Sequence, residues 1–218
     1  MANVAIDGPA GAGKSTVARI LAHKLGYVYI DTGAMYRALT IKAIENNIDM
    51  TDEEAMTNLA NNTVIELRPG DPQEVYLDKR RVTEEIRRPD VSQYVSLVAQ
   101  HQGVREKLVA LQQEIALLNK VVMDGRDIGT KVLPNAKYKF FLDADIAERA
   151  ERRYRELSAS GYPVTREAIK DMLLLRDNQD TSRQFSPLLK AEDAILIDTT
   201  SLSAEEVADK IYSIVKGG

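Results

Sequence analysis

The sequence predicts a three-layer α/β protein with a five-stranded parallel sheet, on two observations. Five short apolar runs recur at residues 3–7, 27–31, 120–124, 138–143 and 194–198, and a helical pattern or helix-start residues follow each of them. Such alternation is typical of βαβ units, which build parallel sheets with helices on both faces. The first run leads directly into a glycine-rich loop, Gly8-Pro-Ala-Gly-Ala-Gly-Lys-Ser15, so the fold is expected to be of the P-loop NTPase type.

Each of the five apolar runs ends in an aspartate, at positions 7, 31, 124, 143 and 198. In open α/β sheets, ligands bind beyond the carboxyl ends of the strands. We therefore expect the functional side chains to gather at that edge of the sheet.

The stretch between the second and third runs breaks the alternation. Residues 63–68 and 73–78 flank Pro69-Gly-Asp-Pro72 and predict an antiparallel hairpin, to which residues 81–84 add a third strand. Helical patterns surround this hairpin at 34–47, 52–61, 90–101 and 103–119. We expect an inserted lobe over residues 34–118, within a core domain made of residues 1–33 and 119–218.

Two further helical regions complete the core. A charged stretch at 145–160 ends at Ser-Gly-Tyr-Pro163, before a helix from Thr165, and a short lid is expected over residues 148–165. The last helix runs from Ser203 to Lys216, with Ser203 as its N-cap and two glutamates in its first turn.

Composition excludes several classes of protein. The 218 residues contain no cysteine and only His23 and His101, which excludes a disulfide framework, a thiolate zinc site and a cysteine nucleophile. No 18-residue apolar segment and no charged-then-apolar leader are present, so a cytoplasmic protein without a membrane partner is expected. The net charge of −4 argues against a nucleic-acid partner.

The glycine-rich loop carries the clearest chemistry. Glycines let successive backbone N–H groups curl around an anion, and the following helix N-terminus adds positive potential. Lys14 is placed to reach the β- and γ-phosphates of a nucleotide, and the Ser15 hydroxyl to ligate Mg²⁺. The sequence therefore predicts ATP and Mg²⁺ as cofactors.

Other motifs decide among the P-loop proteins. Asn119-Lys120 is followed by two valines, and no aspartate has a glycine three places on, so two GTPase signatures are missing. No strand end carries the Asp-Glu pair that is typical of an ATPase motor. Phosphoryl transfer to a small acceptor remains, in a site that closing lobes shield from water.

A phosphorylated acceptor needs arginines, which recognise phosphate with paired hydrogen bonds. Arg37 follows the second strand, and the Arg126-Asp127 pair follows the third, between two glycines. Arg176, Asp180 and Arg183 share one helical face by spacing. A fourth group, Arg149, Arg152, Arg153 and Arg155, lies in the expected lid. Surface ion pairs are the alternative in each case, and Glu148–Arg152 and Glu151–Arg155 have the spacing for them.

Four segments together closely resemble the bacterial cytidylate kinase family: Gly8–Thr16, Asp31–Arg37, Asp124–Thr130 and the Arg176, Asp180, Arg183 set. The resemblance covers nearly the whole chain, including the hairpin after Asn62. It implies that ATP phosphorylates CMP or dCMP by direct in-line transfer in pyrimidine nucleotide metabolism, and that the protein is a monomer. One departure is Gln179, where family members often carry an extra arginine, so the sharing of the ATP charge among lid arginines stays open.

The resemblance also implies roles for single residues. It implies that the ATP phosphates are held by Gly8, Pro9, Ala10, Gly11, Ala12, Gly13, Lys14, Ser15 and Thr16. From the lid itself, Arg149 and Arg153 are expected to reach the same phosphates. The resemblance implies that Thr32 and Arg37 contact the acceptor and that Arg37, Arg126 and Arg183 hold its α-phosphate. Arg176 and Asp180 contact its sugar. The residues implied to recognise its cytosine edge are Ser96, Arg105 and Asp127. Lys14, Arg37, Arg126 and Arg183 are the expected catalytic set.

The base assignment agrees with hydrogen-bond chemistry. A carboxylate such as Asp127 accepts from the cytosine amino group and Arg105 donates to ring acceptors, whereas uracil would set an oxygen against Asp127. Three alternatives stay open at this point: a kinase of another small acceptor such as UMP or shikimate, a nucleotide-binding regulatory module without turnover, and an RNA-binding protein.

Overall fold

The computed structural model describes residues 3–68, 70 and 72–217. Its main sheet has five parallel strands in the order β2-β6-β1-β7-β8, and all five predicted runs contribute to it. The strands are β1 (Val4–Asp7), β2 (Val28–Asp31), β6 (Val121–Gly125), β7 (Tyr138–Asp143) and β8 (Ile195–Asp198). The predicted parallel α/β sheet is confirmed.

The alternation of side chains along β1 builds the two helical layers. Val4 and Ile6 belong to a core shared with α1 (Lys14–Leu25) and α8 (Ala204–Gly217). Ala5 points to the opposite face, into a core shared with Ile128 and the carboxyl end of α5. Ile128 begins a single wide helical turn, η2 (Ile128–Val132), which follows the Arg126-Asp127 pair.

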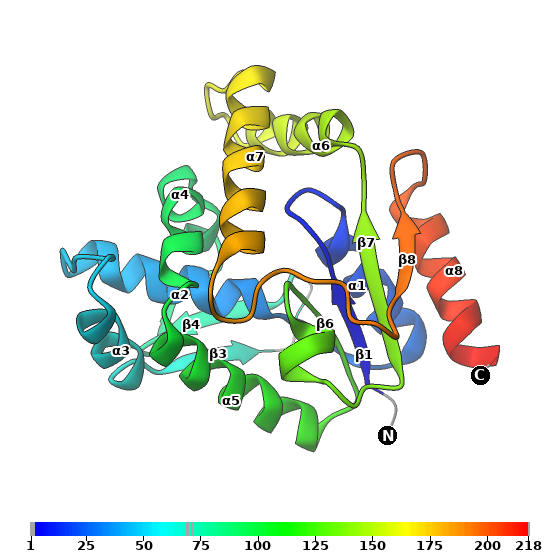
Figure 1. Ribbon diagram of the computed structural model, residues 1–218, viewed down its shortest axis with the longest axis horizontal. Helices are drawn as coiled ribbons and strands as arrows, with labels where there is room; N and C mark the ends of the chain where they lie inside the picture. Colours follow the sequence, from blue (N-terminus) through cyan, green and yellow to red (C-terminus); the bar gives the residue numbers. More distant parts are fainter. Residues whose placement is uncertain (1–2, 69, 71, 218) are drawn as a thin grey trace.

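The insertion between β2 and β6 lies on one side of the sheet in Figure 1, and the end of its last helix packs on the core sheet. Its helices are α2 (Thr32–Glu45), α3 (Glu53–Asn61), α4 (Pro89–Val98), α5 (Gln102–Leu118) and the short turn η1 (Glu85–Arg87). Its antiparallel sheet has the order β3-β4-β5, with β3 (Ile65–Arg68), β4 (Glu74–Leu77) and β5 (Arg80–Arg81).

The predicted hairpin is confirmed in its strands, with Ile65 opposite Leu77, while residues 69 and 71 of its turn lie outside the described residues. The third strand is shorter than predicted and begins one residue earlier. Val82 still donates to the Val75 carbonyl at 2.8 Å, and the side chains of Val82 and Ile86 pack into the core of the lobe.

Gln73 fastens this lobe to the core sheet. Its side-chain amide donates to the Tyr29 carbonyl at 2.6 Å and accepts from the Asp31 N–H at 3.2 Å. Strand β2 lies at the edge of the sheet, so these two bonds satisfy backbone groups that no neighbouring strand reaches.

Two helices stand over the carboxyl ends of the strands, α6 (Ile146–Ala159) and α7 (Arg166–Ser182) (Figure 1). They share a small core in which Ala150, Leu157 and Leu173 pack with Ala10 of the phosphate loop. The predicted lid, residues 148–165, covers most of α6 and the turn before α7. Helix α7 ends at Ser182, so Arg183 lies just outside the helical face on which its spacing had put it.

Within the described residues, no helix combines the length and the apolar character that a bilayer span requires.

Candidate active site

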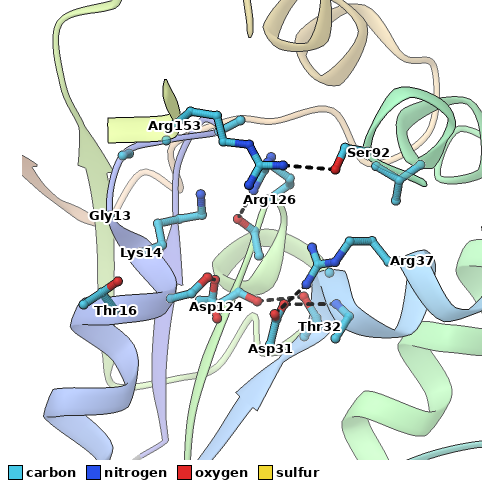
Figure 2. A pocket seen from close by; sticks show the side chains of 18 of the residues that line it. Gly13, Lys14, Thr16, Asp31, Thr32, Arg37, Ser92, Asp124, Arg126 and Arg153 are labelled. Carbon is cyan, nitrogen blue, oxygen red and sulfur yellow. Dashed lines mark hydrogen bonds and ion pairs between the residues drawn. The ribbon is translucent and has the colours of Figure 1, made fainter. Parts of the chain in front are cut away.

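One cavity of about 790 Å³ lies between the phosphate loop, the inserted lobe and the α6–α7 pair. It is lined by most of the predicted site residues: Gly11, Gly13, Lys14, Ser15, Thr16, Thr32, Arg37, Ser96, Arg105, Arg126, Asp127, Arg153, Arg176, Asp180 and Arg183. Ala10 and Ala12 line it as well, whereas Gly8, Pro9 and Arg149 do not. The fold therefore brings segments that are distant in sequence to a single space (Figure 2).

Gly8 marks the point where β1 turns into the phosphate loop. Its φ is +147°, and a Cβ there would lie 2.0 Å from the Leu142 carbonyl oxygen of β7. Only glycine fits this close approach of two backbones. The requirement explains why the loop begins with glycine directly after the strand.

Lys14, the first residue of α1, is buried and turns back over the loop, where its ammonium donates to the Pro9 carbonyl at 2.7 Å. Burial, and next the charge of Arg126, lower the pKa of Lys14 to about 7. A phosphate group beside it would favour the charged form. The lysine is thus poised to respond to an anion in the loop.

Asp124 makes hydrogen bonds both to the start of α1 and to β2 and α2. Its carboxylate accepts from Ser15 Oγ at 2.8 Å and from the Tyr29 hydroxyl at 2.9 Å, while its carbonyl accepts from Thr32 Oγ1 at 2.7 Å. Burial raises the pKa of Asp124 to about 6, and the charge of Asp31 adds to this.

The Ser15 and Asp124 oxygens are donors of the type that Mg²⁺ prefers. Among the described residues there is no cluster of three or more His, Cys, Asp or Glu side chains that would hold a metal ion alone. Such a pair suits a cation that takes its remaining ligands from phosphates and water. The predicted role of Ser15 as a Mg²⁺ ligand fits this donor set. The Asp124 carboxylate is a second candidate ligand for the same ion.

Arg126 and Asp180 link the end of β6 to α7. The Arg126 Nε donates to Asp180 Oδ2 at 2.7 Å, and although burial opposes ionisation, Arg126 and Arg176 hold the pKa of Asp180 below its usual value. Burial and the neighbouring charge of Arg126 lower the pKa of Arg176 to about 9. The Arg176 Nε is buried without a hydrogen-bond partner, as is Arg183 Nη2. Buried unpaired guanidinium donors favour an anionic or oxygen-rich ligand.

The cavity wall also holds a second acid–base pair, which is buried. Arg105 donates to Asp127 Oδ2, and also to the Ala99 carbonyl at 3.0 Å. Arg183 lies 4.0 Å from Asp127 Oδ1, and Ser96 Oγ donates to Asp180 at 3.5 Å. Donors and acceptors thus alternate in a buried space, which is what recognition of a base edge and a sugar requires.

Arg37 lies on the first turns of α2 and lines the cavity, with its guanidinium pointing toward Asp31 (Figure 2). Asp31 caps this helix by accepting from the Ala34 N–H at 3.0 Å, and it pairs with Arg37 Nη2 at 2.6 Å. A Cβ on Gly33 would meet the Arg37 guanidinium at 2.9 Å, so glycine leaves room for this placement.

The four lid arginines divide into different roles. Arg152, Arg153 and Arg155 line the cavity, and Arg153 donates to Ser92 Oγ of the inserted lobe at 3.1 Å (Figure 2). The Glu148–Arg152 and Glu151–Arg155 pairs are both formed, each at 2.9 Å, as the alternative in the sequence allowed.

Arg149 is buried behind the loop, where its donors meet protein oxygens. It donates to the carbonyls of Ala10 and Ala144 and to Asp177 at 3.1, 3.0 and 2.6 Å. An ATP contact by Arg149 stays a prediction.

Sequence reasoning gave no individual role to several lining groups. Asp124 was noted as a strand end, Tyr29 was given no role, and Arg152 was considered only as one of the four lid arginines. Tyr36 also lines the cavity, and its hydroxyl is buried without a partner, with its pKa raised by burial to about 12. The available signal was position alone: Asp124 lies near the carboxyl end of β6, and Tyr29 lies in β2, the strand beside it.

Comparison with solved structures supports the fold. The chain aligns with a shikimate kinase from Bacteroides thetaiotaomicron over 99% of its own length and 98% of that chain, at a TM-score of 0.51 and 12% identity. An uncharacterized protein from Eubacterium ventriosum gives a TM-score of 0.53 at 14% identity, over 100% of this chain and 99% of that one. At these identities the likeness concerns the fold alone.

Sequence comparison is far more specific. The family model described as cytidylate kinase matches residues 4–217. Proteins named cytidylate kinase from Bacillus velezensis and Bacillus subtilis are 55% and 53% identical, each over 98% of this chain and 96% of the relative. One from Caldicellulosiruptor bescii is 52% identical over 98% of this chain and 97% of its own length. With the cavity described above, these matches show that the chain belongs to the cytidylate kinase family and is a nucleoside monophosphate kinase.

Proposed function

We propose that this protein transfers the γ-phosphoryl group of ATP directly to the α-phosphate of CMP or dCMP, forming ADP and CDP or dCDP. The observation that carries the proposal is the shared cavity, in which Lys14 and Ser15 lie opposite the Arg126–Asp180 and Arg105–Asp127 pairs. The relatives named cytidylate kinase support the same acceptor. The protein is further expected to be a cytoplasmic monomer without nucleic-acid or membrane partners.

On the donor side, the loop from Gly8 to Thr16 would hold the ATP phosphates through its N–H groups. Lys14 would place its positive charge on the β- and γ-phosphates. The Ser15 hydroxyl and the Asp124 carboxylate would hold Mg²⁺, which supplies neutralisation of the phosphate charge when bound. Positioning and charge neutralisation then carry the chemistry, and no covalent enzyme intermediate is needed.

On the acceptor side, Arg37, Arg126 and Arg183 would hold the α-phosphate in line with the transferred group. Asp180 is suited to this because it holds Arg126 Nε at 2.7 Å, while Nη1 makes only a long bond of 3.3 Å to the Gly125 carbonyl and Arg126 lines the cavity. Arg176 and Asp180 would contact the sugar hydroxyls, with Thr32 beside the acceptor.

Base choice would rest on Ser96, Arg105 and Asp127. The Asp127 carboxylate would accept from the cytosine 4-amino group, while Arg105, which is paired with Asp127, would donate to ring acceptors. A uracil 4-oxygen would meet a carboxylate without a proton between them, a mismatch that a buried site penalises.

Shielding from water would come from the lid. Arg153 donates to Glu156 of α6 and to Ser92 of α4, so it already spans the gap between lid and lobe. With Arg152 beside Gly13, it is suited to share the ATP charge when α6 approaches the loop, together with Arg149 behind it.

The test is an ADP-release assay with CMP, dCMP, UMP, AMP and shikimate side by side. We expect turnover with CMP and dCMP, and values of kcat/KM at least ~10-fold lower for the others. Equal turnover of UMP or shikimate would assign another acceptor. Binding of ATP without ADP release for any acceptor would indicate a regulatory module.

A further inference from the structure

Asp7 holds the segment that carries the acceptor-side pair. It is the last residue of β1, directly before Gly8, and only 4% of it is exposed. Its Oδ1 accepts from the Ile128 N–H and its Oδ2 from the Gly129 N–H, both at 2.7 Å. Both carboxylate oxygens are thus engaged with the backbone that immediately follows Asp127.

The alternation of β1 explains this contact. Ala5 faces the core that contains Ile128, and Asp7, two residues later, points to the same face of the sheet. A carboxylate that receives two N–H groups of adjacent residues fixes both the position and the direction of that backbone.

Packing leaves the segment from Gly125 to Gly129 little room to shift. A Cβ on Gly125 would lie 2.6 Å from Thr32 Oγ1, and one on Gly129 would lie 3.3 Å from Asp7 Oδ2. At the beginning of the segment Thr32 Oγ1 donates to the Asp124 carbonyl at 2.7 Å, and at its end the Asp7 hydrogen bonds hold Ile128 and Gly129. Arg126 and Asp127 lie between these two anchors.

We propose that Asp7 is a positioning residue for acceptor selection: its two hydrogen bonds set the backbone that aims Asp127 at the base and Arg126 at the acceptor phosphate. The inference rests on the proposed function, because Asp7 would determine how well that site distinguishes cytosine from uracil. Asp7 does not line the cavity, and it acts through the residues it holds.

Protonation of Asp7 gives the proposal a second readout. Burial raises the pKa of Asp7 to about 6, and Asp127 adds to this, while the two N–H groups and Lys14 oppose it. Another charged group beside Gly129 is Lys139, which is paired with Asp193 at 2.8 Å. A protonated Asp7 keeps one accepting oxygen and turns a hydroxyl toward the other N–H, so one hydrogen bond is lost.

The first experiment measures kcat/KM for CMP and UMP with wild type and Asp7→Asn. The amide keeps the size of the carboxylate but sets an NH₂ group against one backbone N–H. We expect the CMP/UMP ratio to fall by roughly 5- to 10-fold, the loss that one buried mismatch produces. The dissociation constant for ATP, measured without acceptor, stays within about 3-fold, because the phosphate loop itself keeps its contacts.

A matched control is Asp198→Asn. Asp198 also ends a strand and accepts from the Thr200 N–H at 2.8 Å and its hydroxyl at 2.6 Å, but it is exposed and makes no bond to the 125–129 segment. The ratio should not change in this variant. A purely structural role for Asp7 would lower the melting temperature and the active fraction for both acceptors equally, and would leave the ratio unchanged.

The second experiment follows the wild-type ratio with pH. The ratio should decline as pH falls through about 6, and in Asp7→Asn it should stay low and flat. Titration of the acceptor phosphate, with a second pKa of roughly 6, cancels in the ratio because both acceptors carry it. The effects of Asp124 and Lys14 on the phosphates cancel for the same reason.

A backbone-side variant guards against a misfolded Asp7→Asn protein. Gly129→Ala would press a methyl group on Asp7 Oδ2 at 3.3 Å and on Lys139 Cδ at 3.2 Å. We expect Gly129→Ala to lower the CMP/UMP ratio as well, by a smaller factor than Asp7→Asn. In the double variant, the fold-change in this ratio should be smaller than the product of the two single fold-changes. A wild-type enzyme that does not discriminate the acceptors would refute the proposed function. Discrimination that persists in Asp7→Asn, with an unchanged pH profile, would refute the role of Asp7 alone.

Discussion

Arg126 and Asp180 form an ion pair in which Nε and Oδ2 lie 2.7 Å apart, across a sequence separation of 54 residues. The pair joins the end of β6 to helix α7 and orders an arginine that lines the cavity. Because an ion pair of this kind is desolvated, loss of either partner leaves an uncompensated buried charge. The arginine cluster therefore depends on α7 as much as on the strand that carries Arg126.

Arg126→Ala should raise the KM for CMP and also lower kcat. The guanidinium would hold the acceptor phosphate in line, so its loss harms both binding and orientation, by at least ~10-fold in kcat/KM. Steady-state kinetics with each substrate varied in turn measures this. Arg68→Ala, on the exposed small sheet, is the control. A change confined to the KM for ATP would move Arg126 to the donor side.

Lys14→Ala should lower turnover by at least ~10²-fold, because it removes a preorganised charge from the transferring group. The fold should persist, since the Lys14 ammonium contacts the loop carbonyl of Pro9 rather than the apolar core. Circular dichroism and kcat measured on the same preparation check both statements. Lys24→Ala, at the exposed end of α1, should be close to wild type. A folded Lys14→Ala protein with near-normal activity would contradict the assignment of the loop.

Asp127→Asn should reduce the CMP/UMP ratio of kcat/KM by roughly 10-fold, since one mismatched polar contact costs about 1–3 kcal/mol. The amide can donate to the uracil 4-oxygen while still offering one acceptor to cytosine. The competing role of Asp127 is to hold Arg105, with which it is paired. In that case activity would fall equally for both acceptors, and measurement of both on one variant separates the two roles.

ATP binding should take up a proton above about pH 7. Burial and Arg126 lower the pKa of Lys14 to about 7 in the unliganded protein, and a bound phosphate would raise it again. Affinity is then highest below pH 7 and declines as pH rises through that value, since the lysine must first be protonated. Calorimetry near pH 8 in buffers of different ionisation enthalpy measures the uptake. An uptake that persists in Lys14→Ala would assign the proton to another group.

Local patterns were sufficient for the elements and the motifs. The five apolar runs and the hairpin were predicted because strand length and alternation are encoded within a few residues. Lys14, Ser15 and the Arg126-Asp127 pair were found because each lies in a contiguous motif beside a strand end. The resemblance then added Ser96 and Arg105, whose surroundings alone look like ordinary helix surface.

Contacts between distant segments could not be predicted in the same way. Ser15 meets Asp124 across 109 residues, and Asp7 meets Ile128 across 121. Helical spacing placed Arg149 among the lid arginines, but it does not specify that a guanidinium points at the Ala10 carbonyl. Likewise, the spacing of Arg183 from Asp180 says nothing of the helix end at Ser182 that lies between them.

The two bonds of Gln73 to strand β2 also bear on how this protein avoids aggregation. An edge strand presents unpaired N–H and C=O groups to any extended chain that approaches it. Here the side chain of an inserted lobe occupies the groups of Tyr29 and Asp31, as a neighbouring strand would. Removing the insertion to obtain a minimal phosphate-loop domain would thus expose the edge of β2 to strand pairing between molecules. The shortened domain would need another protection of this edge, such as a lysine or proline in β2, to avoid aggregation.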